Sequence, residues 1–314
     1  MSELAQAQPQ TCKIAVVGDV HDLWDEGDQQ ALKALEVDLV LLVGDFGNEA
    51  VEVVRAIASL DLPKAVILGN HDAWFTATSW GRGLRGLDRT DRVQQQLELL
   101  GEAHVGYGKL DFPQWQLTVV GGRPFSWGGP IWKNRSFYQQ RFGVTSFAES
   151  TGKIVAAAQT ACYETIILIG HCGPQGLGDQ AESICGKDWN PIGGDYGDPD
   201  LTDAIDQTRA LTKQIPLVAF GHMHHSLRHT KARLRDRLVT DAWGTVYLNA
   251  ASVPRIVQTP TGKQRNFSIV TLVAGRVSQA SLVWIHDELG IQQQDILYQS
   301  SQEKLAPQPN KLLI

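Results

Sequence analysis

The segment KIAVVGDVH at residues 13–21 joins a short apolar run to a glycine and two polar side chains, Asp19 and His21. Residues 38–45, DLVLLVGD, repeat this form, and residues 65–72, AVILGNHD, repeat it again. Between these runs, residues 28–36 and 48–59 carry apolar side chains at helical spacing, with Asp28 as the expected N-cap of the first helix. Strands that alternate with helices predict βαβ units around a mainly parallel sheet.

The same pattern returns in the second half of the chain. Residues 165–169, TIILI, are followed by Gly170 and His171, and residues 217–220, LVAF, are followed by GHMH at 221–224. A helix is expected between them over residues 201–215. Further strands are expected at 245–248, 266–273 and 277–285, with a hairpin turn at Ala274-Gly275. The early runs are continuously apolar, which is typical of strands covered on both faces.

Two irregular stretches interrupt this alternation. We expect one domain over residues 11–290 with insertions at about 73–164 and 173–200, and a peripheral C-terminal tail at 291–314. One helix near 91–100 and one strand near 116–120 are expected inside the first insertion. Long irregular loops in a compact domain are usually functional or disordered, so these insertions are expected to shape the site.

The composition excludes several classes of protein. With 314 residues, 43% apolar and 20% charged, the chain is neither collagen-like, coiled-coil nor disordered. Its net charge of −6 argues against general nucleic-acid binding. No apolar run approaches the ~20 residues of a membrane span, and we see no secretory leader. Four scattered cysteines fit a reducing compartment, so a cytoplasmic location is expected. The sequence gives no indication of oligomeric state.

The strand ends carry the residues that suggest chemistry. In open α/β sheets, ligands bind outside the carboxyl ends of the strands, and a glycine there lets the chain turn so that the next side chain points into that crevice. Oxygen and imidazole donors without thiolate favour Mn²⁺, Fe²⁺ or Zn²⁺. Seven candidate ligands are too many for one tetrahedral zinc, so two metals that share Asp45 are expected. The seven are Asp19, His21, Asp45, Asn70, His171, His222 and His224.

The ordered set of motifs resembles the signature of the calcineurin-like metallophosphoesterase superfamily, GD-x-H, GD, GNH-D/E, GH and GH-x-H. Here these stand as GDVH at 18–21, GD at 44–45, GNHD at 69–72, GH at 170–171 and GHMH at 221–224. The segment LNAASVP at 248–254 is similar to a turn near the site of that family. The resemblance implies an α/β fold of two packed mixed β-sheets flanked by helices, a four-layer α-β-β-α sandwich.

The resemblance also implies roles for these side chains. One metal would be held by Asp19, His21, Asp45 and His224, and the other by Asp45, Asn70, His171 and His222. His71 would be the unligated histidine that donates a hydrogen bond or proton to the ester. A hydroxide bridging the two metals would attack phosphorus, and the net charge of about +1 at the centre would attract a phosphate anion.

Asn48 marks a departure from one branch of the superfamily. Protein phosphatases carry an aspartate followed by an arginine at the positions of Asn48 and Glu49. Asn48 is expected to orient His71 through its amide without supplying a carboxylate. We therefore expect a small-molecule or nucleotide phosphomonoester or diester, rather than a phosphoprotein, as substrate. The alternative is a catalytically silent scaffold with the same fold, which would need neither the full ligand set nor His71.

Weaker candidates remain in the insertions. GRGLRG at 81–86 matches G-x-G-x-x-G but follows no apolar strand, so we do not interpret it as a dinucleotide fingerprint. Arg82 or Arg85 in this basic loop could contact substrate oxygens, and a solvated loop is the alternative. Arg123 is a similar candidate. Most of the nine tryptophans are expected to be packing anchors, although one could stack on a base.

Overall fold

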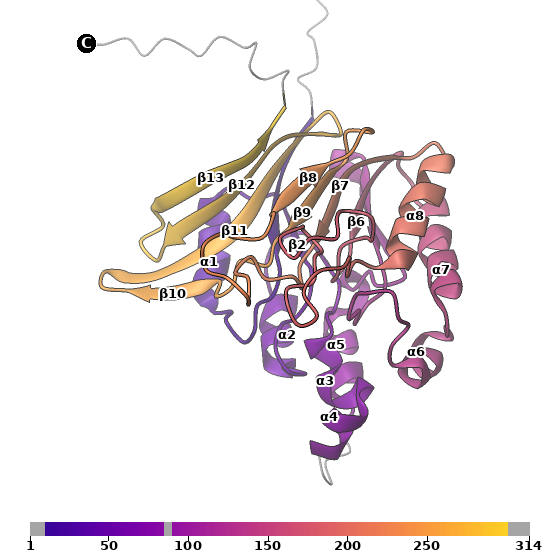
Figure 1. Ribbon diagram of the computed structural model, residues 1–314. Helices are drawn as coiled ribbons and strands as arrows, with labels where there is room; N and C mark the ends of the chain where they lie inside the picture. The colour runs from indigo at the N-terminus through magenta and orange to yellow at the C-terminus, as the bar shows by residue number, and fades with distance from the viewer. Residues whose placement is uncertain (1–9, 85–89, 301–314) are drawn as a thin grey trace, which may run out of the picture.

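A computed structural model describes residues 10–84 and 90–300 and contains two β-sheets packed face to face (Figure 1). The seven-stranded sheet has the order β13-β12-β11-β1-β2-β3, with β10 paired to β11. The strands of this sheet are β1 (Thr11–Val17), β2 (Leu39–Leu42), β3 (Lys64–Val66), β10 (Ile256–Thr259), β11 (Gly262–Val273), β12 (Arg276–His286) and β13 (Ile291–Gln299).

The second sheet has six strands in the order β4-β5-β6-β7-β9-β8. Within it, β5, β6, β7 and β9 run parallel, as β1, β2 and β3 do in the first sheet. Its strands are β4 (Lys109–Phe112), β5 (Leu117–Gly121), β6 (Thr165–Ile169), β7 (Gln214–Phe220), β8 (Leu238–Thr240) and β9 (Val246–Asn249).

Helices cover the outer face of each sheet. The α-helices are α1 (Glu26–Ala34), α2 (Val51–Ala58), α3 (Trp74–Ala77), α4 (Ser79–Leu84), α5 (Arg92–Leu100), α6 (Arg135–Phe142), α7 (Phe147–Gln159) and α8 (Pro199–Ala210). Short 3-10 turns lie at His71–Ala73, Gly101–Ala103 and Pro113–Trp115. Side chains of α1, α2 and α5 pack on the first sheet, and those of α7 and α8 pack on the second.

Strand β1 shows why the apolar runs are continuous. Ile14 and Val16 pack into the core between the two sheets, whereas Ala15 and Val17 pack under the helices. Because successive side chains of a strand point to opposite faces, a strand covered on both faces needs apolar residues at every position. The prediction of two packed sheets flanked by helices is confirmed.

Three sequence predictions need correction. Helix α1 is capped by Asp25 rather than Asp28, which instead accepts a hydrogen bond from the Asp25 backbone N–H in a capping box. Helix α8 ends at Ala210, because residues 214–220 form β7. Residues 73–164 are not simply an insertion, since they supply β4 and β5, and β5 pairs in parallel with β6.

The C-terminal region also differs from expectation. Residues 291–299 form β13, which pairs antiparallel with β12, instead of a peripheral tail. Its glutamines are tolerated because β13 is an edge strand with mostly exposed side chains. Residues 301–314 lie outside the described residues. Residues 173–198 are irregular, as expected, and contain no helix or strand. Of the helices described, none is both long and apolar enough to cross a membrane.

Candidate metal centre

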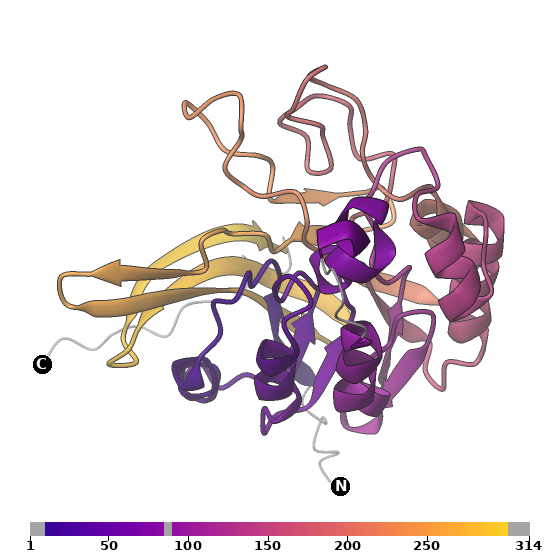
Figure 2. The ribbon, with the colours of Figure 1, turned by 90° about the horizontal axis from the view of Figure 1, so that it is seen from below.

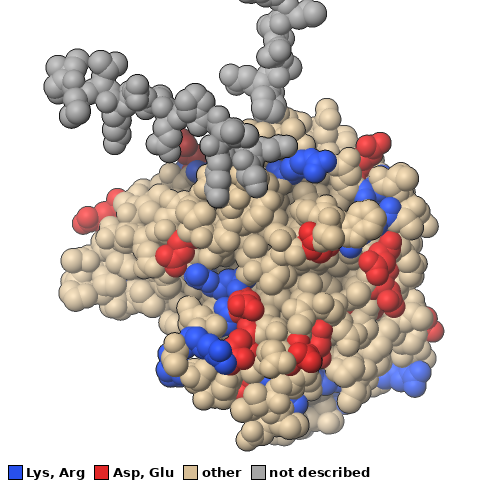
Figure 3. All heavy atoms as spheres, turned by 45° about the horizontal axis from the view of Figure 1, so that its top comes forward, with Lys and Arg blue, Asp and Glu red and all other residues tan. Residues whose placement is uncertain are grey.

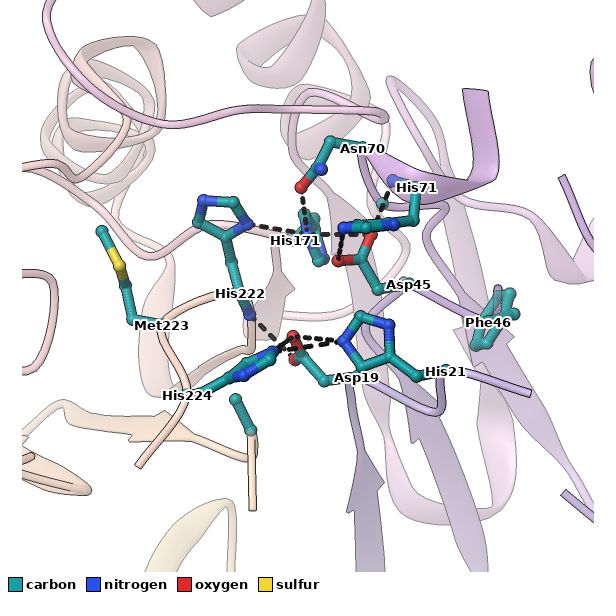
Figure 4. Close-up of polar contacts among 12 residues, drawn as sticks. Asp19, His21, Asp45, Phe46, Asn70, His71, His171, His222, Met223 and His224 are labelled. Carbon is teal, nitrogen blue, oxygen red and sulfur yellow. Dashed lines mark hydrogen bonds and ion pairs between the residues drawn. The ribbon is translucent and has the colours of Figure 1, made fainter. Parts of the chain in front are cut away.

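The carboxyl ends of five strands from both sheets converge on one group of polar side chains (Figure 4). Asp19 follows β1 and Asp45 follows β2, while the turn after β3 carries Asn70 and His71. The second sheet contributes residues from the turns after β6 and β7, namely His171, His222 and His224. These residues lie together because strands that run parallel end at the same edge of a sheet.

Unusual backbone conformations aim several of these side chains into the site. Asp19, His21, Asp45 and His222 have φ angles of 51°, 44°, 56° and 67°. Positive φ is uncommon outside glycine and persists where surrounding structure holds it. Here the Asp19 N–H donates to the Gly44 carbonyl at 3.0 Å, and the His21 N–H donates to the Asp45 carbonyl at 2.9 Å. These bonds lock the turn after β1 against the turn after β2.

The first ligand group consists of Asp19, His21 and His224. Asp19 Oδ1 lies 3.3 Å from His224 Nε2 and 3.8 Å from His21 Nε2, and the two imidazole nitrogens are 3.2 Å apart. Asp19 is 1% exposed, and its Oδ1 atom has no hydrogen-bond partner among the described residues. A buried carboxylate oxygen facing two imidazole nitrogens is suited to a cation.

The second ligand group consists of Asp45, His171 and His222, with Asn70 beside it. His171 Nε2 lies 3.2 Å from Asp45 Oδ1, 3.0 Å from Asn70 Oδ1 and 3.2 Å from His222 Nδ1. His171 Nδ1 lies 2.8 Å from the Val43 carbonyl, to which it must donate its proton. With its Nδ1–H on the Val43 carbonyl, His171 turns Nε2 toward two oxygen acceptors, and this arrangement favours a positive charge there, either a proton on Nε2 or a bound cation.

The close packing of carboxylates and imidazoles also shifts the pKa values of these groups. Burial alone would raise the pKa of Asp45, but His171 and the other imidazoles hold that pKa well below its usual range. Burial opposes charge on His171, yet Asp45 raises the pKa of His171 to about 9. Burial and the neighbouring His171 lower the pKa of His222 to about 3. The carboxylates thus favour a positive charge at the centre, and a bound metal ion would supply it in place of a proton.

His71 lies at the partly exposed side of the centre and forms a third candidate group with His21 and Asp45, one residue from each of the two ligand groups. Its Nδ1 is 2.6 Å from Asn48 Oδ1, its backbone N–H donates to Asp45 Oδ1 at 2.8 Å, and its Nε2 is 3.9 Å from Asp45 Oδ2. The ring stacks on Trp74 at 4.6 Å between centroids, and 29% of the side chain is exposed. Because the Asn48 oxygen accepts from Nδ1, the Nε2 atom is the one free for proton transfer. Burial lowers the pKa of His71.

Comparison with known proteins assigns the sequence to a family. Residues 12–226 match the family model described as calcineurin-like phosphoesterase. The chain belongs to this family. The symmetrical bis(5'-nucleosyl)-tetraphosphatase of Mannheimia succiniciproducens is 34% identical over 85 residues, which are 24% of this chain and 30% of that protein. The chain thus matches less than a third of that relative's length.

Solved structures bear on the fold of this calcineurin-like phosphoesterase. One solved chain superposes with a TM-score of 0.50 at 10% identity, over 84% of this chain and 95% of its own length. A dimetal phosphatase from Danio rerio is 11% identical, covers 93% of this chain and 100% of its own, and has a TM-score of 0.45. At such low identity the resemblance concerns architecture alone.

Asp72 is a buried residue beside the candidate centre to which the sequence analysis assigned no role. Its fully buried carboxylate accepts hydrogen bonds from the backbone N–H groups of Asp45 at 2.9 Å, Phe46 at 2.9 Å and Gly69 at 2.7 Å. Asp72 therefore fixes the turn after β2 against the turn after β3. The motif GNHD at 69–72 contained the signal, but its partners are backbone atoms that the sequence does not reveal.

The arginines predicted to contact substrate are placed differently. Arg123 is 3% exposed and is held by Asp198 and Asp200, so it is not available at the site surface. Its carboxylate partners lie 75 and 77 residues away, which explains why the sequence did not reveal the pairing. The exposed Arg82 donates from its guanidinium to the Thr76 and Ala77 carbonyls. Arg85 lies outside the described residues.

Proposed function

We propose that this calcineurin-like phosphoesterase is a dinuclear metal-dependent hydrolase of small-molecule or nucleotide phosphate esters. The observation that carries the proposal is the placement of two ligand groups side by side, with the His71 imidazole at their open edge. A scaffold without catalytic activity would not need a histidine oriented by Asn48 at that position.

The proposed ligands divide as the two groups suggest. Asp19, His21 and His224 would hold one divalent ion, and His171, His222 and Asn70 would hold the other. Asp45 would contribute to both, since one carboxylate oxygen lies 3.2 Å from His171 Nε2 and Asp45 also offers an oxygen within 4.8 Å of a ring nitrogen of His21. The oxygen and imidazole donors suit Mn, Fe or Zn. Such a pair of ions supplies an activated water and charge neutralisation for a phosphate group.

The chain's own residues would orient the ester and move the proton. His71 in its doubly protonated form would donate from Nε2 to the leaving oxygen, while Asn48 Oδ1 accepts from Nδ1–H and fixes the orientation of the ring. Trp74 would restrict the ring plane by stacking on it at an interplanar angle of 13°. Asp72 would position Asp45 through the backbone.

Substrate class and location are also part of the proposal. The similarity to a protein named as a nucleosyl tetraphosphatase supports nucleotide esters over phosphoproteins. On the face shown in Figure 3, basic and acidic side chains are interspersed, which supports a small anionic substrate over general nucleic-acid binding. We propose a cytoplasmic location because all four cysteines are free.

Metal content and hydrolysis, measured on the same preparations, test this function. The purified chain, reconstituted with Mn²⁺, is expected to bind about two ions by elemental analysis and to hydrolyse an aryl phosphate mono- or diester. His71→Ala should lower turnover by about 10²–10⁴-fold while metal content stays the same. His229→Ala, whose ring pairs with Glu182, is the matched control.

A further variant separates the metal centre from catalysis. Asp45→Ala should lose bound metal, because its carboxylate lies within ligand distance of His171 in one group and of His21 in the other. Full metal occupancy in Asp45→Ala would refute the shared ligand. If the protein binds two ions but hydrolyses neither monoesters nor diesters, the enzyme hypothesis is wrong and the catalytically silent scaffold remains.

A further inference from the structure

Four aromatic side chains form two pairs of contacting rings, and the first pair stacks on His71. Trp74, which stacks on His71, stacks in turn on Trp127 with centroids 5.3 Å apart. In the second pair, Tyr196 packs on Trp189 with ring centroids 4.8 Å apart. None of these four aromatic side chains is fully buried. These rings therefore offer apolar surface beside the proposed proton donor.

Three cations lie on these rings. Lys133 Nζ is 5.7 Å from the Trp127 centroid and 5.6 Å from the Tyr196 centroid, so it bridges the two rings. Lys187 Nζ lies 5.7 Å from Tyr196, and the Arg228 guanidinium lies 5.5 Å from Trp189. We call this set of four aromatic and three basic side chains the aromatic–cation wall.

Within residues 10–84 and 90–300, no carboxylate forms an ion pair with Lys133, Lys187 or Arg228. By contrast, Arg123 and Arg265 each pair with two or more aspartates. Cations left without an anionic partner beside a phosphoesterase centre are positioned to bind an anionic ligand.

The wall is built across loops that are fixed to one another. The Gly129 N–H donates to the Tyr196 carbonyl at 2.8 Å, and a Cβ on Gly129 would lie 2.9 Å from the Tyr196 ring. The backbone N–H of Arg228 donates to Asp188 at 2.8 Å. Figure 2 shows the loop between β6 and α8 (pink) beside the loop between β7 and β8 (orange). The rings and cations are therefore held in place before any ligand arrives.

We propose that the aromatic–cation wall binds the part of the substrate that is not hydrolysed, and that this part belongs to a nucleoside oligophosphate. The base would pack on Trp127 and Tyr196, and phosphates beyond the reacting one would pair with Lys133, Lys187 and Arg228. A simple aryl phosphate would leave the cations unused, and an inorganic oligophosphate would leave the rings unused. This inference rests on the proposed function, because the wall is defined by its position beside His71.

Binding of a non-hydrolysable nucleotide tests the inference independently of turnover. Adenosine 5'-(β,γ-imido)triphosphate is titrated calorimetrically into the full chain reconstituted with Mn²⁺, with inorganic tripolyphosphate and phenyl phosphonate as comparison ligands. Trp127→Leu should weaken nucleotide binding by about 10-fold, because base–aromatic stacking is lost, and should affect tripolyphosphate less. Lys133→Gln should weaken both the nucleotide and tripolyphosphate by about 10-fold.

Matched controls lie away from the wall. Trp243→Leu removes a 76% exposed tryptophan near the start of β9, at the edge of the sheet opposite the metal centre. Lys153→Gln removes an exposed lysine of α7. If nucleotide affinity in Trp127→Leu and Lys133→Gln matches these controls, the inference is wrong. If the parent protein still hydrolyses an aryl phosphate ester in that case, the proposed function stands. If it does not, both the proposed function and this inference are wrong.

Discussion

Replacement of Arg123 by methionine should lower the free energy of unfolding and should not weaken substrate binding directly. Arg123 Nε lies 2.9 Å from Asp200 Oδ2, and one terminal nitrogen lies 2.6 Å from Asp198 Oδ1. All three side chains are at most 3% exposed. The pair joins the segment after β5 to the start of α8, so Arg123→Met leaves two buried carboxylates without their cation.

The magnitude follows from the burial of these charges. Removing one partner of a buried ion pair typically costs about 3–5 kcal/mol, which is a large fraction of a total stability of about 5–15 kcal/mol. The guanidinium also lies over Trp132, at 4.8 Å from the ring centroid, and methionine retains part of that apolar contact. We therefore expect the free energy of unfolding to fall by about 3–5 kcal/mol.

The loss should depend on pH in a defined direction. Burial raises the pKa of Asp198 to about 7, and the Arg123 charge opposes that rise. Without Arg123 the folded-state pKa rises further above the unfolded value of about 3.9. A group with a raised pKa in the folded state contributes stability below its unfolded pKa and loses it as pH increases through the folded pKa. The deficit of Arg123→Met should thus be larger at pH 8 than at pH 5.

Urea unfolding followed by far-UV circular dichroism at pH 5 and pH 8 measures both effects. Arg233→Met is the control, because Arg233 pairs with Glu182 but is 67% exposed, and its loss should cost less than about 1 kcal/mol. If Arg123→Met unfolds within about 0.5 kcal/mol of the parent while KM for a phosphate ester rises, Arg123 binds substrate after all.

Three further predictions concern the turns, the first helix and the metals. Asp72→Asn leaves at least one of three backbone N–H donors facing an amide N–H₂ group. The free energy of unfolding, measured by urea titration, should therefore fall by about 1–3 kcal/mol. The exposed control Asp203→Asn should show almost no change. Burial of Asp25 raises its pKa, but hydrogen bonds and charges from Lys263 and Arg265 outweigh burial and lower that pKa to about 2. The contribution of ionised Asp25 to folding stability is therefore present above pH ~4 and is lost as pH falls to ~2. Thermal melts from pH 2.5 to 6 should show this pH dependence of stability in the parent protein and not in Asp25→Asn. The difference in unfolding free energy should be less than about 1 kcal/mol, because the Asp25 carboxylate is 37% exposed. A chelator should lower the melting temperature, and Mn²⁺ should restore it, since a ligand at 100 times its Kd adds about 2.7 kcal/mol; identical melts with and without chelator would argue against bound metal.

Local patterns in the sequence were sufficient for β1, β2, β3, β11 and β12 of the first sheet and for the parallel strands of the second. The runs 13–17 and 165–169 were predicted as strands because β-branched residues continue between turn signals, and β1 and β6 follow them closely. The edge strand β13 was missed, because its glutamine-rich sequence lacks that signal and is held only by hydrogen bonds to β12. Strand β4 was not predicted, whereas β5 closely follows the strand expected near 116–120.

The ligands of the candidate centre could be anticipated for a similar reason. Each lies within three residues after a glycine at the end of an apolar run, and parallel strands bring their carboxyl ends to one edge whatever the intervening sequence. The contact between Asn48 and His71 was also anticipated. The roles of Asp72 and Arg123 were not, because the partners of Asp72 are backbone atoms and those of Arg123 are distant in the chain.

The sequence by itself therefore determined the family, the parallel sheets and the residue types at their carboxyl edge, since these depend on local periodicity and order along the chain. Only the tertiary structure decided which charges are neutralised internally and which remain available. Arg123 is paired and buried, whereas Lys133 lies on two rings with no carboxylate paired to it among the described residues. The physical reason is that an ion pair depends on distances between segments far apart in sequence, and folding alone sets those distances.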